Sequence, residues 1–360
     1  MAEAATGGSA AAGGSAGPGW RRIATEEAFL IPEVASALGS WAAEAGPDEP
    51  DQDFWSFVLS QDLPGLRRVR RQLLDLTGER LRIMDEHGVS VHLLSLTAPG
   101  VQTLPGPAAV SLAALVNDRL AATIARHPDR FAGLAAVAPQ DPSAAAAEIE
   151  RAIGSLGLNG VVINSHTRNE YLDEEKFWPI FEAAEALAAP VYIHPRSPSA
   201  QMAGPYRKFG LETAMAGFQA DTGLHAIRLI CSGVFDRFPG LRIVLGHLGE
   251  GIPFWLYRLD YMHPVRSSRN TRPALELTPS EYFTRNFAIT TSGMNWHPAL
   301  RFCIEAVGAG NIMFAIDYPY QLTEGAVTFM NDAPIPDEDK RKIFHQNAER
   351  IFRIAPAGDR

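Results

Sequence analysis

The chain has 360 residues, of which 46% are hydrophobic and 20% are charged, a balance typical of a soluble globular enzyme. Its formal net charge of −9 argues against a nucleic-acid-binding protein, because such proteins present basic surfaces to phosphates. Two cysteines, Cys231 and Cys303, form no disulfide framework, so we expect a reducing, cytoplasmic setting.

The first 19 residues, MAEAATGGSAAAGGSAGPG, are rich in alanine, glycine and serine. They lack the basic start and the continuous apolar core of a signal peptide. Because they cannot bury enough surface to offset the entropy of ordering, we predict a disordered tail. The chain contains no run of 18 uninterrupted apolar residues, so we expect neither a membrane-spanning helix nor a membrane partner.

From Trp20 onward, short apolar runs alternate with longer segments of helical periodicity. Eight runs are predicted strands, at residues 22–29, 91–99, 131–139, 160–166, 190–196, 242–249, 287–293 and 312–319. Six of the intervening segments are predicted helices, at residues 73–88, 108–128, 143–157, 177–188, 224–239 and 297–310. The two cysteines fall within the last two of these helices.

This alternation predicts an α/β fold of the (β/α)₈ TIM-barrel type. Continuous apolar strands separated by helices are typical of a parallel sheet that is covered on both faces. Eight such units favour a closed barrel over an open doubly wound sheet, and no glycine-rich phosphate loop follows the first strand. We expect residues 20–360 to form one catalytic domain with short insertions.

Polar and ionisable residues recur where the predicted strands end. Active sites of such barrels lie at the carboxyl ends of the strands. Burying even a neutral polar group there without a partner would cost roughly 1–3 kcal/mol. We therefore expect the side chains at these ends to converge on one site. They are Glu26, Glu27, Thr97, Asn164, His166, His194, His247 and Asp317.

Within this group, Glu26, His194 and Asp317 offer two carboxylates and one imidazole, a ligand set that suits Mn²⁺, Zn²⁺ or Mg²⁺. Glu250 follows His247 by three residues, about one helical turn. At that spacing the carboxylate can fix the tautomer of the imidazole and favour its protonated form. For Glu27 a structural role is favoured, because it alternates to the side of the strand opposite Glu26.

Seven of the other histidines are assigned no chemistry. His166 suits a structural role and a functional role equally well. The rest are interpreted as surface or capping residues at helix ends or in loops: His87, His92, His127, His263, His297 and His345.

The chain resembles the amidohydrolase superfamily, whose hydrolases usually carry His-x-His after the first strand. Here that position is Glu26-Glu27-Ala28, and the fourth strand, GVVINSH, has no lysine that could bridge two metals. Both departures imply a single metal and match the branch of non-oxidative decarboxylases that act on ortho-hydroxybenzoates. The segments RIATEEAF, LTAPGVQ, NSHTRNEYLDEE, GHLGEGIPFWLYRLDYMH and DYPYQ most resemble the 5-carboxyvanillate decarboxylases.

The resemblance implies roles for individual residues. One divalent metal, Mn²⁺ before Zn²⁺ or Mg²⁺, binds Glu26, His194 and Asp317, with His247 and Glu250 beside it. The implied substrate-binding residues are Thr97, His225, Arg258 and Tyr320. Arg258 is implied to reach the substrate of a neighbouring subunit in a homodimer or homotetramer. The chain departs from the family in the loop from Ser40 to Leu66, and the early pocket arginine falls at Arg67 or Arg68.

The resemblance also makes Asp317 the candidate acid for decarboxylation. A free aspartate titrates near ~3.9, and an adjacent cation lowers that value, so Asp317 is expected to be ionised before substrate binds. Our hypothesis is that it takes the phenolic proton and delivers it to the ring carbon, while His247 stabilises the departing carboxylate. A metal-dependent hydrolase of an amide, lactone or carbon–carbon bond is the alternative enzyme, and a non-catalytic barrel is the alternative from another class.

Overall fold

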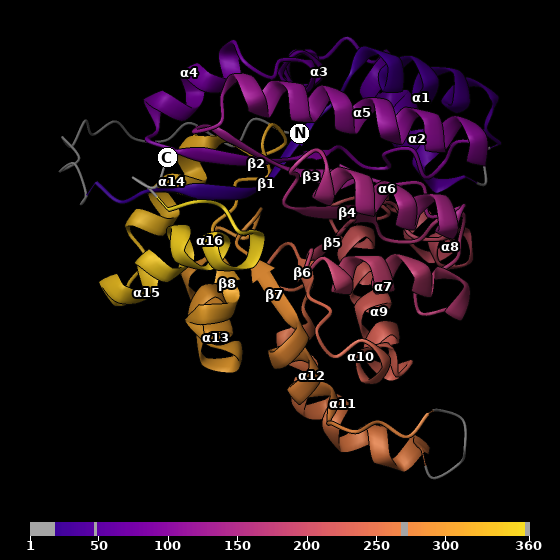
Figure 1. Cartoon of the computed structure of the whole chain (residues 1–360), viewed down its shortest axis with the longest axis vertical. Helices are drawn as coiled ribbons and strands as arrows, with labels where there is room; N and C mark the ends of the chain where they lie inside the picture. Colours follow the sequence, from indigo (N-terminus) through magenta and orange to yellow (C-terminus); the bar gives the residue numbers. More distant parts are fainter. Residues whose placement is uncertain (1–18, 47–48, 268–272, 357–360) are drawn as a thin grey trace.

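The computed structural model describes residues 19–46, 49–267 and 273–356, which contain a barrel of eight parallel strands (Figure 1). Strand order follows the sequence, which confirms the predicted (β/α)₈ fold. The strands are β1 (Ile23–Phe29), β2 (Val91–Leu96), β3 (Phe131–Ala136), β4 (Gly160–Asn164), β5 (Val191–His194), β6 (Ile243–Leu245), β7 (Phe287–Thr290) and β8 (Ile312–Met313). The predicted tail lies outside the described residues, apart from Gly19.

All eight predicted strands are present, but most end earlier than predicted. Every residue of β1 and β2 is buried, as expected for parallel strands with helices outside and side chains inside. The run 312–319 was predicted as one strand, whereas β8 is regular only over Ile312–Met313. The polar residues after the last paired position, including Asp317, belong to loops at the carboxyl end of the barrel.

The described residues contain sixteen α-helices, thirteen in the connections between strands and three after β8. They are α1 (Pro32–Glu44), α2 (Pro50–Ser60), α3 (Pro64–Leu74), α4 (Glu79–Glu86), α5 (Gly106–Arg126), α6 (Pro142–Gly154), α7 (Trp178–Ala186), α8 (Ala200–Arg207), α9 (Gly217–Cys231), α10 (Val234–Arg237), α11 (Ile252–Ser267), α12 (Pro279–Asn286), α13 (His297–Val307), α14 (Thr323–Asn331), α15 (Asp337–Arg341) and α16 (Asn347–Phe352). Several begin with a proline in the first turn, where its missing N–H leaves no helical bond unmade. Both cysteines lie in helices, as predicted.

The region between β1 and β2 differs from the prediction. The resemblance implies a loop from Ser40 to Leu66, yet this range contains the end of α1, the whole of α2 and the start of α3. The single helix predicted at 73–88 is also wrong, because α3 ends at Leu74 and α4 begins at Glu79. The side chain of Asp75 accepts hydrogen bonds from the backbone N–H groups of Thr77, Gly78 and Arg80, and these bonds replace helical ones at the break.

Helix α5 is long and apolar enough, by length and composition alone, to cross a membrane. In the barrel it packs against β3, and the side chain of Asn117 exchanges two 2.8 Å hydrogen bonds with the backbone of Ala136. Its position is that of a barrel helix.

An apolar core fills the amino end of the barrel. It contains inward residues of the strands, among them Ile23, Leu93 and the ring of Tyr192. Helix α16 adds Ile351 and Phe352 to the same cluster, and Phe352 is completely buried. The C-terminal helix therefore docks against this end of the barrel.

The seam between β8 and β1 is irregular. Beyond Met313, backbone bonds join Thr25 N–H to Phe314 O (3.1 Å) and Ala28 N–H to Tyr318 O (2.7 Å). A single bridge pairs Glu27 with Tyr318. The chain that carries Asp317 therefore runs beside β1 without a continuous ladder.

Candidate metal centre

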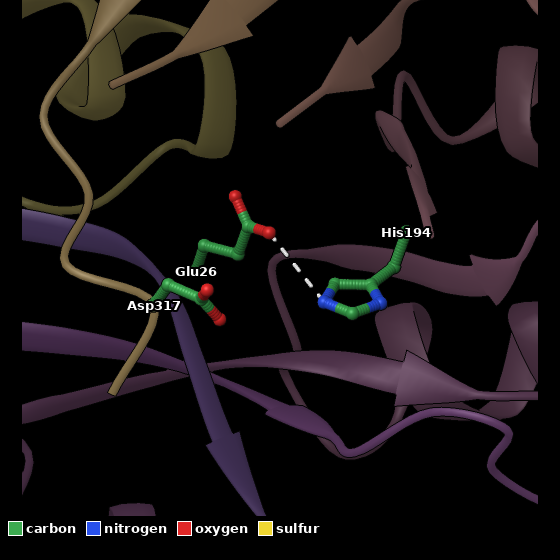
Figure 2. A group of neighbouring side chains, drawn as sticks. All are labelled: Glu26, His194 and Asp317. Atoms are coloured by element: carbon green, nitrogen blue, oxygen red, sulfur yellow. Dashed lines mark ion pairs between the residues drawn. The ribbon is translucent and has the colours of Figure 1, made fainter. Parts of the chain in front are cut away.

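The three predicted metal ligands lie together at the carboxyl end of the barrel. Glu26 comes from β1, His194 ends β5, and Asp317 follows β8. One ligand atom from each residue lies within 4.8 Å of the others, and the three side chains converge in Figure 2. The Nε2 atom of His194 is 3.4 Å from Glu26 Oε1.

A β-bulge determines which glutamate of β1 faces this centre. Ala24 pairs with His92 and Glu27 pairs with Leu94, so β1 has one more residue than β2 over this stretch. Such a bulge reverses the alternation of side chains beyond it. Ile23 points into the barrel, and after the bulge Glu26 does so as well, while Glu27 faces the other side.

The two carboxylate oxygens of Glu26 have different surroundings. Oε2 accepts hydrogen bonds from the hydroxyl groups of Tyr192, Ser292 and Thr290, the last at 3.0 Å. Oε1 is buried and has no hydrogen-bond partner among the described residues. Burial raises the pKa of Glu26, but His247, His194 and the hydroxyl donors outweigh it, so the pKa is lowered. An ionised, orientated carboxylate with one free oxygen is what a divalent cation requires.

His247 lies beside the three ligands and is held by Glu250. Its Nδ1 is 2.7 Å from Glu250 Oε1, and its Nε2 is 3.8 Å from Glu26 Oε1 and 3.9 Å from Asp317 Oδ2. Burial alone would lower the pKa of His247, but the carboxylates of Glu250 and Glu26 raise it well above its usual range. The predicted pairing of His247 with Glu250 is present.

The backbone at this centre is unusual. His247, Glu250 and Asp317 have φ values of 52°, 53° and 73°, in the left-handed region. For residues other than glycine this costs of order 1–3 kcal/mol each and is concentrated at functional sites. Gly246 allows a close approach, since a Cβ there would lie 2.8 Å from Glu26 Oε2. Burial raises the pKa of Asp317, while His247 opposes the rise.

A cavity of about 400 Å³ is lined by His194, His247 and Asp317 together with the predicted substrate residues Thr97 and Tyr320. The hydroxyl groups of Thr97 and Tyr320 are 2.6 Å apart. Much of the remaining wall is apolar and comes from α2, α3 and α9. These wall residues are Phe54, Trp55, Phe57, Val58, Leu66, Val69 and Phe218. The expected loop from Ser40 to Leu66 thus supplies most of these apolar wall residues.

Two residues assigned to the substrate by resemblance lie elsewhere in this chain. His225 is fully buried in α9, where its Nε2 accepts the N–H of Leu172 at 3.0 Å and burial lowers its pKa to about 3. Arg258 lies exposed on α11, which extends away from the barrel with α12 (Figure 1). Neither lines the cavity described here. Contact between Arg258 and substrate therefore needs a second copy of the chain.

The arginine that lines the cavity is Arg196, two residues after His194, whereas Arg67 and Arg68 do not line it. The Nε of Arg196 donates to Asp51 Oδ2 at 2.7 Å, and both side chains are buried. Asp51 is in the first turn of α2, so this pair attaches α2 to the barrel beside the metal centre. No local sequence pattern connects residues so far apart in the chain.

Sequence reasoning also missed the three hydroxyl residues that hold Glu26. Tyr192 precedes His194 by two residues and shares its side of β5, which is a signal that could have identified it. Thr290 and Ser292 stand at the end of β7 with the same spacing. Uncharged hydroxyl groups are common in strands, so these positions did not stand out.

Two predictions about the other histidines need correction. His92 is fully buried within β2, and His263 is buried in α11, so neither is a surface residue. His166 is buried too, with its Nε2 3.0 Å from Ser197 O and its Nδ1 accepting the N–H of Asn169 at 3.3 Å. These contacts favour the structural interpretation of His166.

Comparison with known proteins identifies the family. An amidohydrolase family model matches residues 52–354. A gamma-resorcylate decarboxylase of Polaromonas sp. is 36% identical over 324 residues, covering 85% of this chain and 95% of that protein. The structure of 5-carboxyvanillate decarboxylase from Sphingomonas paucimobilis is 50% identical, with a TM-score of 0.90 over 93% of this chain and 100% of that one.

A second 5-carboxyvanillate decarboxylase structure, from Novosphingobium aromaticivorans, contains manganese and 4-hydroxy-3-methoxy-5-nitrobenzoic acid. It is 41% identical, covers 93% of this chain and 96% of that one, and has a TM-score of 0.90. The chain therefore belongs to the amidohydrolase family, and within that family it groups with metal-dependent decarboxylases, which are carboxy-lyases.

Proposed function

We propose that the protein is a manganese-dependent, non-oxidative decarboxylase of an ortho-hydroxybenzoate, with 5-carboxyvanillate as the model substrate. The observation that carries the proposal is the convergence of Glu26, His194 and Asp317, the last two of which line a cavity whose other walls are largely apolar. The free Oε1 of Glu26 and the mixed carboxylate and imidazole donors fit one divalent cation. Mn²⁺ is our first choice because solved relatives contain it, and Zn²⁺ or Mg²⁺ would suit the same donors.

A divalent cation held by these residues would bind the carboxylate and the ortho oxygen of the substrate together and favour the phenolate form. Asp317 then takes the phenolic proton and delivers it to the ring carbon that carries the carboxylate. The bond between this carbon and the carboxylate then breaks, and CO₂ leaves. The electron pair of the broken bond stays with the ring and restores its aromaticity. Glu250 keeps His247 orientated and protonated beside the departing group.

The cavity walls match an aromatic acid. Phe54, Trp55 and Phe218 offer flat apolar surfaces to a ring. Thr97 and Tyr320, already joined by a hydrogen bond, present hydroxyl groups to polar ring substituents. We propose that the barrel is a single catalytic domain, which carries both the metal ligands and the cavity.

We also propose that the active protein is a homo-oligomer, a dimer or a tetramer. Phe254, Trp255, Tyr257 and Tyr261 on α11 are 51–82% exposed in the single chain, beside Arg258. A second copy covering this face could bring Arg258 to the neighbouring cavity. We place the enzyme in the cytoplasm, consistent with its free cysteines.

The test is decarboxylation of a panel of hydroxybenzoates by protein reconstituted with Mn²⁺. We expect CO₂ release from 5-carboxyvanillate, 2,6-dihydroxybenzoate or a related ortho-hydroxy acid. The ortho-methoxy analogue should be inert, because it lacks both the chelating oxygen and the transferable proton. Turnover of the methoxy analogue at a comparable rate would overturn the proposal and favour the metal-dependent hydrolase.

A further inference from the structure

Glu27 is a buried carboxylate next to a proposed metal ligand, but it takes no part in the metal centre. It is fully buried on β1, directly after Glu26. Neighbouring strand residues point to opposite sides, and the bulge between Ala24 and Glu27 places Glu26 rather than Glu27 on the inner side. Glu27 therefore faces the seam between β1 and the chain that follows β8.

At that seam, Glu27 binds the backbone on both sides of Asp317. Its Oε1 accepts the N–H of Ile316 at 2.9 Å, and its Oε2 accepts the N–H of Tyr318 at 3.1 Å. Each oxygen of this buried carboxyl group is thus paired with one backbone N–H, and breaking either bond would leave a buried polar group without a partner. One side chain thus holds the backbone on both sides of Asp317.

Asp317 needs such external support. The ladder of β8 ends at Met313, so regular strand pairing does not hold the residues that follow. With φ at 73°, Asp317 occupies a conformation that an isolated chain rarely adopts and that surrounding structure must impose. The bridge between Glu27 and Tyr318 is the only β pairing assigned to this stretch within the described residues.

Arg80 supports the same arrangement from α4. Its Nη2 donates to Ala28 O at 2.6 Å, and its guanidinium lies over the ring of Tyr318, 4.5 Å from the ring centre. Burial raises the pKa of Glu27 to about 8, and the two N–H donors and the charge of Arg80 oppose that rise. Through Ala28 O on one side and the ring of Tyr318 on the other, Arg80 thus contacts both sides of the seam.

We propose that Glu27 is a positioning residue that holds Asp317 in place for metal binding and proton transfer. This inference rests on the proposed function in assigning Asp317 to the metal and the proton. Glu27 touches neither; it acts through the backbone of residues 316–318.

The test is the variant Glu27→Gln, which keeps the shape of the side chain. Its amide N–H₂ group would face one of the two backbone N–H groups, so one hydrogen bond is lost. We expect Mn²⁺ affinity, measured on apoprotein by electron paramagnetic resonance titration, to fall roughly 10- to 100-fold, as for other residues that orientate metal ligands. We expect kcat to fall with it. The matched control is Asn347→Ala, which removes two buried hydrogen bonds, to Ala309 O and Ile312 O, at the start of β8. The control should lose stability but keep wild-type Mn²⁺ affinity.

A folded Glu27→Gln protein with wild-type Mn²⁺ affinity would overturn the inference. If the variant does not fold, hydrogen exchange in the wild-type protein decides. The amides of Ile316 and Tyr318 should be protected even without metal, and exchange as fast as in an open loop would contradict the role. The two proposals can fail separately. If Glu27→Gln weakens Mn²⁺ binding but the wild-type protein turns over no hydroxybenzoate, the proposed decarboxylation is refuted and the positioning of Asp317 still holds.

Discussion

The two ends of the barrel are formed by the same eight strands but bury opposite kinds of side chain. At the amino end, Leu93, Ile351 and Phe352 belong to one apolar cluster closed by α16. At the carboxyl end, Glu26 and Asp317 are packed against histidines and hydroxyl groups. The apolar end stabilises the fold, whereas the polar end gathers like charges that a metal would neutralise. Substitutions at the two ends should therefore affect different measurements.

The largest effect on activity is expected from Asp317→Asn. Loss of the proposed acid and metal ligand should lower turnover by at least roughly 10²–10⁴-fold. The melting temperature should stay near that of the wild type or rise, because Asp317 is one of two neighbouring carboxylates that repel each other, and the substitution removes its charge. Steady-state kinetics and thermal unfolding measure the two quantities. Turnover within tenfold of wild type would refute the assignment of Asp317.

At the other end, Phe352→Ala should have the reverse effect. Truncating this fully buried ring should destabilise the protein by about 3–5 kcal/mol, because a large cavity would remain. Mn²⁺ affinity of the folded variant should not change. Phe209 is 71% exposed, so Phe209→Ala is a matched control that should leave denaturant unfolding nearly unaltered. An equal loss of Mn²⁺ affinity in Phe352→Ala would remove the distinction between the two ends.

Tyr192 connects the two ends, since its ring belongs to the apolar core and its hydroxyl binds Glu26. Tyr192→Phe keeps the ring and removes one donor, so Mn²⁺ affinity should fall roughly 10-fold or more with a small change in stability. Tyr282→Phe is the matched control, because that hydroxyl binds Asp236 in another part of the protein. Isothermal titration with Mn²⁺ should separate the variants, and equal affinities would show that the hydroxyl does not orientate Glu26.

The smallest effect is expected at His92, outside both ends. Neither ring nitrogen has a hydrogen-bond partner among the described residues, and burial, with the charges of Arg80 and Arg130, lowers the pKa of His92 well below 6.5. The unfolded chain gains a proton below pH 6.5 and the folded chain does not, so this contribution to stability is lost as pH falls. His92→Phe should reduce the slope of unfolding free energy between pH 6.5 and 4.5 by up to about 1.4 kcal/mol per pH unit. An unchanged slope would mean that His92 is protonated when folded.

The same contrast accounts for what the sequence could predict. All eight strands were identified because short continuous apolar runs, such as those of β2 and β5, are typical of parallel strands that are buried on both faces. The convergence of Glu26, His194 and Asp317 was predictable because each stands at a strand end, and barrel topology brings such ends together.

The remaining features depend on contacts that no local pattern encodes. Simple alternation from Ile23 would direct Thr25 and Glu27 inward, and only the bulge selects Glu26. The pairing of Asp51 with Arg196 joins an inserted helix to a strand end across a long stretch of sequence. The sequence did not predict helix α2. Contacts with the cavity and the barrel determine where its aromatic residues lie, and a local sequence pattern does not contain those contacts.

The most direct test of the proposed chemistry is to determine the source of the proton that replaces the carboxylate on the ring. Wild-type protein with Mn²⁺ should decarboxylate an accepted ortho-hydroxybenzoate in deuterated water, and proton magnetic resonance should locate the deuterium in the product. We predict one deuterium per ring, at the carbon that lost CO₂, since Asp317 delivers an exchangeable proton to that position. Carboxylate loss without deuterium at that carbon, or label at another ring position, would contradict protonation by Asp317 at the metal centre.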